Sequence, residues 1–157
     1  MKLFRCAVVV ALAVALSLGG CAPSETASTH PAAVAVRDLL ALRSVNSTDV
    51  AAYEPFFAEP SLAEELAGNS QAAGEESTVP ESDTPYVSRI ESDTADVVVR
   101  WHSDEKSFPG WPSATVFSLK WADGRWVIVD AVDPEGAVPA PIDESELIGT
   151  PGNTVEK

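Results

Sequence analysis

The sequence predicts an α+β domain in which short N-terminal helices pack on an antiparallel sheet of about four strands. Three observations indicate this class. Apolar residues at helical spacing begin after residue 31, alternating β-branched and aromatic residues dominate from residue 86 to residue 132, and Asp123-Gly124 separates the two most regular of these alternating runs. Asp-Gly between such runs favours a hairpin, because a type I′ turn requires positive φ at both central residues.

Two helices are expected in the first part of the domain. The first begins at Pro31, whose missing N–H has no intrahelical partner at that position, and continues through Arg43 with an apolar stripe. The second is capped by Asn46 and ends near Tyr53, because Pro55 interrupts the backbone hydrogen bonds. The first helix is expected to pack on the sheet.

A third helix and two polar segments complete the prediction outside the strands. Ser61-Leu62-Ala63-Glu64 is a capping-box pattern that opens the helix, and Gly68 is expected to end it. Residues 69–85 carry Gly, Pro and acidic residues but few apolar ones, which indicates a flexible loop. Residues 134–157 have a similar composition and are expected to form a disordered acidic tail.

The alternation of apolar and polar residues predicts four strands, over residues 86–91, 95–102, 114–121 and 126–132. With Asp123 and Gly124 as the loop of the hairpin, three pairs are expected on one face: Trp121 with Trp126, Leu119 with Ile128, and Phe117 with Asp130. This face is apolar apart from Asp130, so we expect it to face the core.

The N-terminus resembles that of a bacterial lipoprotein. Basic residues near the start precede an uncharged apolar run over residues 6–18, which is too short to span a bilayer comfortably as a helix. Leu18-Gly19-Gly20-Cys21 follows, and this order of an aliphatic residue, two small residues and a cysteine resembles the lipobox. Residues 1–20 are therefore interpreted as a signal peptide.

The lipobox resemblance implies cleavage between Gly20 and Cys21 and acylation of Cys21. Residues 21–30 then form a lipidated tether of small and polar residues. We expect the mature protein to lie at the extracytoplasmic face of the cell membrane, where its acyl chains hold it to the lipid bilayer without spanning it. The alternative is an ordinary secretory signal with an incidental cysteine.

Charge and cysteine content limit the classes of partner. The chain has 24 acidic residues against 10 basic ones and a formal net charge of −14, which argues against nucleic acid and against adhesion to anionic lipid headgroups. It has 2 cysteines. Cys6 lies in the signal peptide and Cys21 would be acylated, so neither remains for a disulfide or a metal cluster. No cofactor or metal is expected.

The last hairpin resembles that of small lipoproteins with a nuclear-transport-factor-2-like or cystatin-like fold. Its sequence, Asp123-Gly124-Arg125-Trp126-Val127-Ile128-Val129-Asp130, is similar to the Asp-Gly-x-Trp-x-Ile-x-Asp pattern that often closes such domains. The resemblance covers residues 31–133 and implies a curved, cone-like sheet that wraps a long helix. Two features depart from that pattern, because the expected helices are short and the loop over residues 69–85 is long.

Four residues are candidates for ligand binding. Enzymes of that fold, such as ketosteroid isomerase and scytalone dehydratase, are similar in using carboxylate, tyrosine or histidine side chains inside the cone. Asp130 is the corresponding candidate here, because the expected register points it to the core face. Phe108 and Trp111 lie in a proline-braced loop that could form the rim of a binding site. Tyr53, on the second helix, is the fourth candidate.

These observations favour a non-catalytic module that binds a small hydrophobic ligand or an envelope protein. The alternative is an isomerase- or dehydratase-like enzyme that acts on a hydrophobic small molecule with Asp130 as the base. No second catalytic group stands at a recognisable spacing, and the chain has no Gly-x-Ser-x-Gly or His-Glu-x-x-His motif. A third alternative is an accessory subunit without a ligand, for which an uncovered face around residues 127–129 would be the sign.

Overall fold

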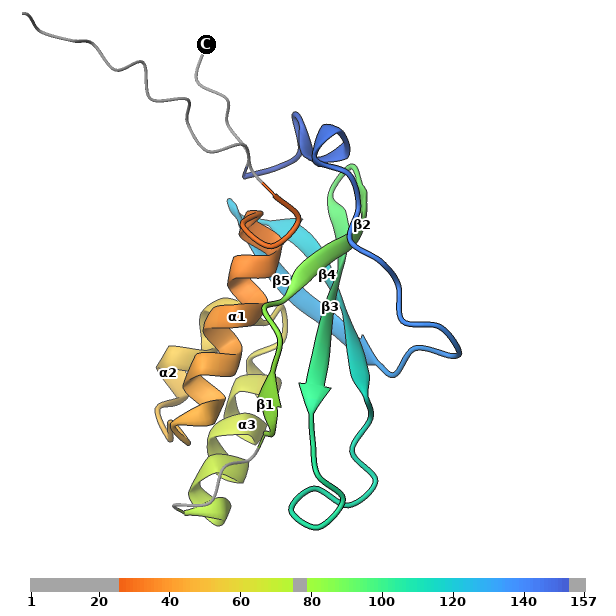
Figure 1. Ribbon diagram of the computed structural model, residues 1–157. Helices are drawn as coiled ribbons and strands as arrows, with labels where there is room; N and C mark the ends of the chain where they lie inside the picture. Colours follow the sequence, from red (N-terminus) through yellow and green to blue (C-terminus); the bar gives the residue numbers. More distant parts are fainter. Residues whose placement is uncertain (1–25, 75–78, 153–157) are drawn as a thin grey trace, which may run out of the picture.

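The predicted fold class is confirmed by a computed structural model, which describes residues 26–74 and 79–152. Three helices come first: α1 (Pro31–Ser44), α2 (Val50–Tyr53) and α3 (Pro60–Ala73), with a 3₁₀ turn (Glu54–Phe56) between α2 and α3. They lie on one side of a curved sheet, and α1 runs along its concave face (Figure 1). The result is a half-barrel with α1 inside the curve and with α2 and α3 beside α1.

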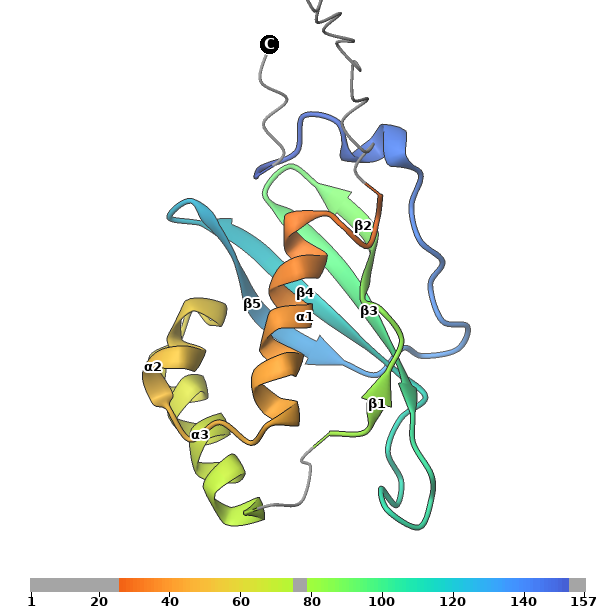
Figure 2. The same ribbon diagram turned by 60° about the vertical axis from the view of Figure 1, so that its left-hand side comes forward.

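The sheet contains β1 (Glu81–Ser82), β2 (Tyr86–Glu91), β3 (Thr94–His102), β4 (Ala114–Ala122) and β5 (Arg125–Val132). All pairings are antiparallel. Both β1 and β2 pair with β3, which is followed by β4 and then by β5. Figure 2 shows the sheet curling around α1. The strands β2 to β5 are those expected from the sequence, and the two-residue strand β1 lies inside the segment predicted as a loop.

The hairpin between β4 and β5 follows the predicted register only near its turn. Asp123 and Gly124 have φ values of 51° and 79°, as a type I′ turn requires. Trp121 pairs with Trp126 and Leu119 with Ile128, as expected. A register shift between Ser118 and Leu119 then places Asp130 opposite Ser118, and Phe117 opposite Ala131. The predicted pairing of Phe117 with Asp130 is therefore wrong, because a β-bulge adds one residue to β5.

The core lies between α1 and the concave face of the sheet. The buried residues of α1 are Ala32, Ala33, Val36, Leu39 and Leu40. Alternate residues of the central strands are also buried, among them Val97, Val99, Phe117 and Leu119. Each such aliphatic or aromatic side chain contributes roughly 1.5–3 kcal/mol when fully removed from water. These buried side chains of α1 and the strands fill most of the interior of the half-barrel.

The second helix ends where expected but has a different cap. The N-cap of α2 is Asp49, whose Oδ1 accepts a hydrogen bond from the Ala51 N–H at 3.0 Å. Asn46 lies just after α1 with φ 48° and donates from Nδ2 to the Gly74 carbonyl at 2.9 Å. A left-handed Asn is a common helix C-terminus. Asn46 therefore terminates α1, and the prediction that it caps α2 is wrong.

The third helix is longer than predicted. It begins at Pro60 after the N-cap Glu59, which makes no side-chain capping bond, and it ends at Ala73 before Gly74. Gly68 lies inside this helix, so the prediction that it ends the helix is wrong, and residues 69–73 are helical. A glycine in a helix costs only about 0.5–1 kcal/mol, and the burial of Ala67 and Ser70 on either side of Gly68 outweighs that cost.

Substituting the two glycines of this region should have opposite effects. Gly68 is exposed, and a Cβ there would meet no atom within 4 Å, so Gly68→Ala is expected to raise the free energy of unfolding by about 0.5–1 kcal/mol. Gly74 has φ 65°, so Gly74→Ala is expected to lower the free energy of unfolding by about 1–3 kcal/mol. Urea denaturation of both variants tests this, and a destabilised Gly68→Ala would contradict the continuous helix.

The C-terminal segment packs on the domain. We call residues 133–152 the C-terminal strap, which runs from the end of β5 past β2 and over the end of the sheet (Figures 1 and 2). Hydrogen bonds hold it to the domain: Tyr86 Oη donates to the Pro139 carbonyl at 2.8 Å, the Ile142 N–H to the Val87 carbonyl at 3.1 Å, and Trp126 Nε1 to the Pro151 carbonyl at 3.1 Å. The predicted disordered tail is therefore wrong for residues 134–152.

The residues just before α1 also belong to the domain. Ala27 is buried, and its carbonyl accepts a hydrogen bond from the Val87 N–H at 2.8 Å. Residues 26–30, predicted as part of a polar tether, thus pack beside β2. The signal peptide and the rest of the tether lie outside the described residues, as do Gly20 and Cys21.

His30 joins the start of α1 to the C-terminal strap. It is 0% exposed, and its Nδ1 accepts a hydrogen bond from the Ala32 N–H at 3.2 Å. Its Nε2 lies 2.9 Å from Thr150 Oγ1, and that hydroxyl donates to the Leu147 carbonyl at 2.7 Å. Nε2 must therefore carry the proton of a neutral ring. Burial lowers the pKa of His30 from 6.5 to about 4.

Candidate functional site

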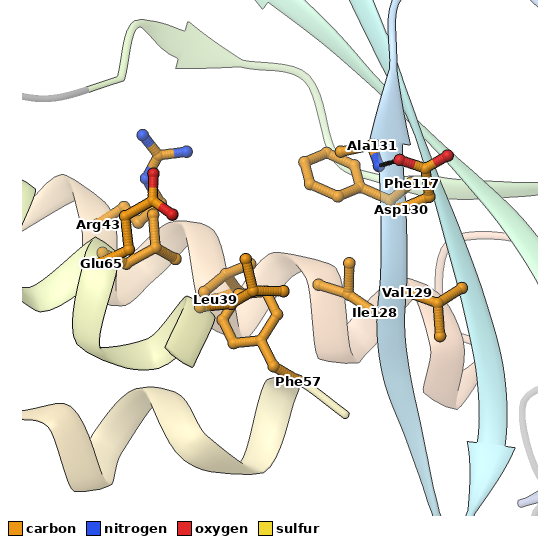
Figure 3. A pocket seen from close by; sticks show the side chains of 11 residues that line it. Leu39, Arg43, Phe57, Glu65, Phe117, Ile128, Val129, Asp130 and Ala131 are labelled. Atoms are coloured by element: carbon orange, nitrogen blue, oxygen red, sulfur yellow. Dashed lines mark hydrogen bonds between the residues drawn. The ribbon is translucent and has the colours of Figure 1, made fainter. Parts of the chain in front are cut away.

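A pocket opens between the helices and the last strand. Its volume is about 290 Å³, and it lies where α1, α3 and β5 meet (Figure 3). The lining residues are Leu39 and Arg43 of α1, Phe57 just after the 3₁₀ turn, Leu62, Glu65 and Leu66 of α3, Phe117 of β4, and Ile128, Val129, Asp130 and Ala131 of β5. This volume is close to the lower end of the range for small-molecule sites, about 300–1,000 Å³.

The walls of the pocket are mainly apolar because α1, the segment after the 3₁₀ turn and β5 direct core side chains toward it. Leu39 lies on the buried face of α1. Phe57 follows the 3₁₀ turn, in which Pro55 stands at the start, and its backbone forms an isolated parallel bridge with Ile128 of β5. That bridge ties the helical layer to the sheet. The pocket is therefore built by rigid elements that meet at β5.

Two charged side chains lie on the helical side of the pocket. Figure 3 shows Arg43 and Glu65 across from Ile128 of β5. Burial lowers the pKa of the Arg43 guanidinium, and an electrostatic interaction with Tyr53 acts in the opposite direction. An arginine stays protonated at neutral pH. Arg43 thus brings a partly desolvated positive charge to a wall that also carries Glu65, and electrostatic interactions there are stronger than in water.

Asp130 lines the pocket but directs its carboxylate elsewhere. The residue is exposed, and its Oδ1 accepts a hydrogen bond from the Ala131 N–H at 2.8 Å. Figure 3 shows the carboxylate on the side of β5 away from Leu39, Phe57 and Arg43. The bulge in β5 is the cause, because one extra residue turns the following side chain to the other face. The prediction that Asp130 shares the core face is wrong.

Tyr53 is a core residue that does not line this pocket. Its side chain is 0% exposed, and its Oη lies 3.3 Å from Ser70 Oγ of α3. It does not belong to the residues that line the pocket. Tyr53 therefore joins α2 to α3 through its contact with Ser70.

The other two sequence candidates form an aromatic cluster at a different place. The ring centroids of Phe108 and Trp111 are 5.7 Å apart, and those of Trp111 and Trp101 are 5.6 Å apart, both in edge-to-face arrangements. Trp111 Nε1 is buried, with no hydrogen-bond partner within residues 26–74 and 79–152. The cluster fastens the loop between β3 and β4 onto the sheet, and neither Phe108 nor Trp111 lines the pocket.

Sequence reasoning missed the charged residues of the pocket. Arg43 stands four positions after Leu39, so both side chains lie on the same face of α1. That spacing could have indicated a basic group beside the core. The position of Glu65 on α3 gives no such signal, because its approach to α1 depends on how the two helices cross.

The part of the chain that the structure describes contains no candidate metal site and no helix that could span a membrane. Within residues 26–74 and 79–152, no group of three or more His, Cys, Asp or Glu side chains could hold a metal ion. Over the same ranges, the helices are too short or too polar to cross a membrane.

The fold and the pocket together define a class of protein, namely an α+β half-barrel with an apolar pocket between its helices and its last strand. Comparisons with models of known families, with curated proteins and with solved structures found no match for this chain. The resemblance to lipoproteins with a nuclear-transport-factor-2-like domain stays a prediction from the sequence.

Proposed function

We propose that the protein is a lipid-anchored module at the extracytoplasmic face of the cell membrane, and that its pocket binds a small, mainly apolar molecule without converting it. The anchor rests on the lipobox pattern that ends at Cys21. The observation that carries the binding role is the pocket itself, where α1, α3 and β5 place an apolar wall beside Arg43 and Glu65.

The composition of the pocket defines the chemistry of the ligand. An apolar body that covers Leu39, Phe57 and Ile128 would be stabilised by about 25 cal/mol for each Å² of apolar surface removed from water. A single polar group would lie near Arg43 and Glu65, because charged groups in a partly apolar wall form strong charge-assisted hydrogen bonds. The ligand class is therefore a small amphipathic molecule.

The position of Asp130 does not favour the isomerase or dehydratase alternative. A general base must lie within hydrogen-bond reach of the proton that it removes. The exposed Asp130 carboxylate is instead held by the Ala131 N–H on the outer side of β5. An enzyme of that class would need a different base in this pocket.

A second role, binding of an envelope protein, is favoured by one observation. Val129 and Val132 of β5 are 50% and 49% exposed, whereas Val127 is 3% exposed. These two apolar side chains lie on the last strand of the sheet, where a partner strand could add. Crosslinking from Val132→Cys in membranes would capture such a partner if this role holds.

The binding role predicts the effect of filling the pocket. Ala131 lines the pocket and is exposed, so Ala131→Phe should fit without unfolding the protein and should occupy the space of the ligand. The probe is 1-anilinonaphthalene-8-sulfonate, an apolar dye with one anionic group, titrated against residues 26–157. We expect Ala131→Phe to weaken dye binding at least tenfold, which corresponds to about 1.4 kcal/mol.

The matched control is the adjacent Val132→Phe, which adds an equal ring to the next residue of the same strand, outside the lining of the pocket. Dye binding by this variant should stay within twofold of the unsubstituted protein. Equal binding by both variants would contradict a ligand in this pocket. Native mass spectrometry of the same proteins would show whether a bound molecule is carried through purification by the control and lost by Ala131→Phe.

A further inference from the structure

The two ends of the described chain meet at one end of the domain. His30, just before α1, lies 2.9 Å from Thr150 of the C-terminal strap. A Cβ on Gly152 would lie 3.3 Å from Pro31 and 3.1 Å from Trp121. Figures 1 and 2 show residues 26–31 and 147–152 side by side at this end, which we call the strap end.

The strap end is separated from Cys21 by a short stretch of chain. Five peptide units join Cys21 to Thr26, and even a fully extended chain of that length spans at most about 18 Å. If Cys21 is acylated, as the proposed function holds, Thr26 stays within that distance of the bilayer surface. The inference below rests on that anchor.

Two apolar features of the strap end suit a lipid surface. Ile148 is 72% exposed. A groove of about 460 Å³ reaches this end of the domain, and its lining includes Pro31, Trp121 and Gly152 together with the charged Asp38 and Arg125. Trp and aliphatic side chains are the residues that partition into the interface of a bilayer. The exposed Glu144 and Glu146 of the strap would be repelled by anionic headgroups, so a neutral lipid surface fits best.

The ligand pocket lies toward the opposite end of α1. Arg43 is twelve residues after Pro31, which corresponds to about 18 Å along the helix axis. Val45, the C-cap residue of α1, is 73% exposed at this far end. A domain that stands on its strap end therefore holds the pocket away from the bilayer.

We propose that the strap end of the domain faces the lipid bilayer, with Ile148 in the headgroup region, and that the short connection to Cys21 keeps the pocket of α1, α3 and β5 open to the aqueous compartment. The ligand then enters from water and not from the bilayer.

The test compares two exposed positions at the two ends of the domain. The acylated full-length mature protein, purified from membranes as Ile148→Cys or Val45→Cys, is labelled with a thiol-reactive bimane dye and placed in vesicles of phosphatidylcholine. Part of this lipid carries a spin label near the headgroup, which quenches nearby dyes. We expect at least twofold stronger quenching at position 148 than at position 45, although the two native side chains are equally exposed at 72% and 73%.

Equal quenching at the two positions, or stronger quenching at position 45, would overturn the orientation. A second variant carries twenty Gly and Ser residues inserted between Glu25 and Thr26, and it should lose the difference. If the difference persisted, the short connection would not be its cause.

Failure of the anchor is distinguished by flotation and by labelling. A protein without acylated Cys21 would not float with the vesicles, and it would take two dye molecules instead of one. That result overturns both the anchor and the orientation. A protein that floats with one dye and shows no difference overturns the orientation alone.

Discussion

Replacing Leu147 by alanine is expected to lower the free energy of unfolding by about 3 kcal/mol, within the range of roughly 2–5 kcal/mol for truncation of a buried leucine. Leu147 is only 1% exposed although it lies in the C-terminal strap. It ends the 3₁₀ turn Glu144–Leu147, and its carbonyl accepts the hydroxyl of Thr150. Truncation would leave a cavity in the hydrophobic core, to which Leu147 belongs.

The adjacent Ile148 provides the control for this substitution. Because Ile148 is 72% exposed, Ile148→Ala is expected to change the free energy of unfolding by less than about 0.5 kcal/mol. Urea denaturation monitored by tryptophan fluorescence measures both variants, since Trp126 contacts the strap through Pro151. Equally small effects of the two substitutions would contradict a packed strap and would favour the disordered tail that composition suggests.

Lowering the pH from 6.5 to 4 is expected to remove about 3 kcal/mol of stability through His30 alone. Burial lowers its pKa to about 4 in the folded protein, against 6.5 in the unfolded chain, and each pKa unit corresponds to 1.36 kcal/mol. Between these two values the unfolded chain binds a proton that the folded protein excludes, so stability falls as the pH falls. Above about pH 7.5 and below about pH 3, roughly one unit beyond the two pKa values, this residue has little further effect.

The structural reason is the hydrogen bonding of the neutral ring. In the neutral ring, Nδ1 accepts a hydrogen bond from the Ala32 N–H at 3.2 Å. A proton added to Nδ1 would face that N–H and would break the cap of α1. His30→Asn keeps a capping side chain without a group that titrates in this range. The difference in unfolding free energy between pH 6.5 and pH 4 should therefore be smaller by about 3 kcal/mol in His30→Asn than in the unsubstituted protein.

The unsubstituted protein is the control, and each value is taken from urea denaturation at the two pH values. A pH dependence in His30→Asn equal to that of the unsubstituted protein would show that the ring is not buried in its neutral form.

Local patterns predicted the elements of the domain well. The start of α1 at Pro31, the end of α2 at Tyr53 and the turn at Asp123 and Gly124 all appear where the sequence places them. Each depends on the backbone preferences of one or two residues. Where a preference was weak, prediction failed: Gly68 disfavours a helix by about 1 kcal/mol at most, and the packing of α3 outweighs it.

The candidate site depended on contacts between distant residues, and little of it was predictable. Strict alternation placed Asp130 in the core, but one inserted residue in β5 turned it outward. Tyr53 was placed on the correct helix, yet the packing of α2 on α3 removed it from the pocket. Arg43 and Glu65 come together only because α1 and α3 approach the same strand.

The sequence by itself determined the α+β class, the order of the helices and strands, and the turn of the last hairpin, because these follow from backbone preferences and from apolar periodicity over a few residues. Only the tertiary structure decided the bulge in β5, the packing of the strap on His30 and Trp126, and the pocket. These features depend on how surfaces far apart in the chain fit together, and composition, which made residues 134–152 look disordered, contains no information about that fit.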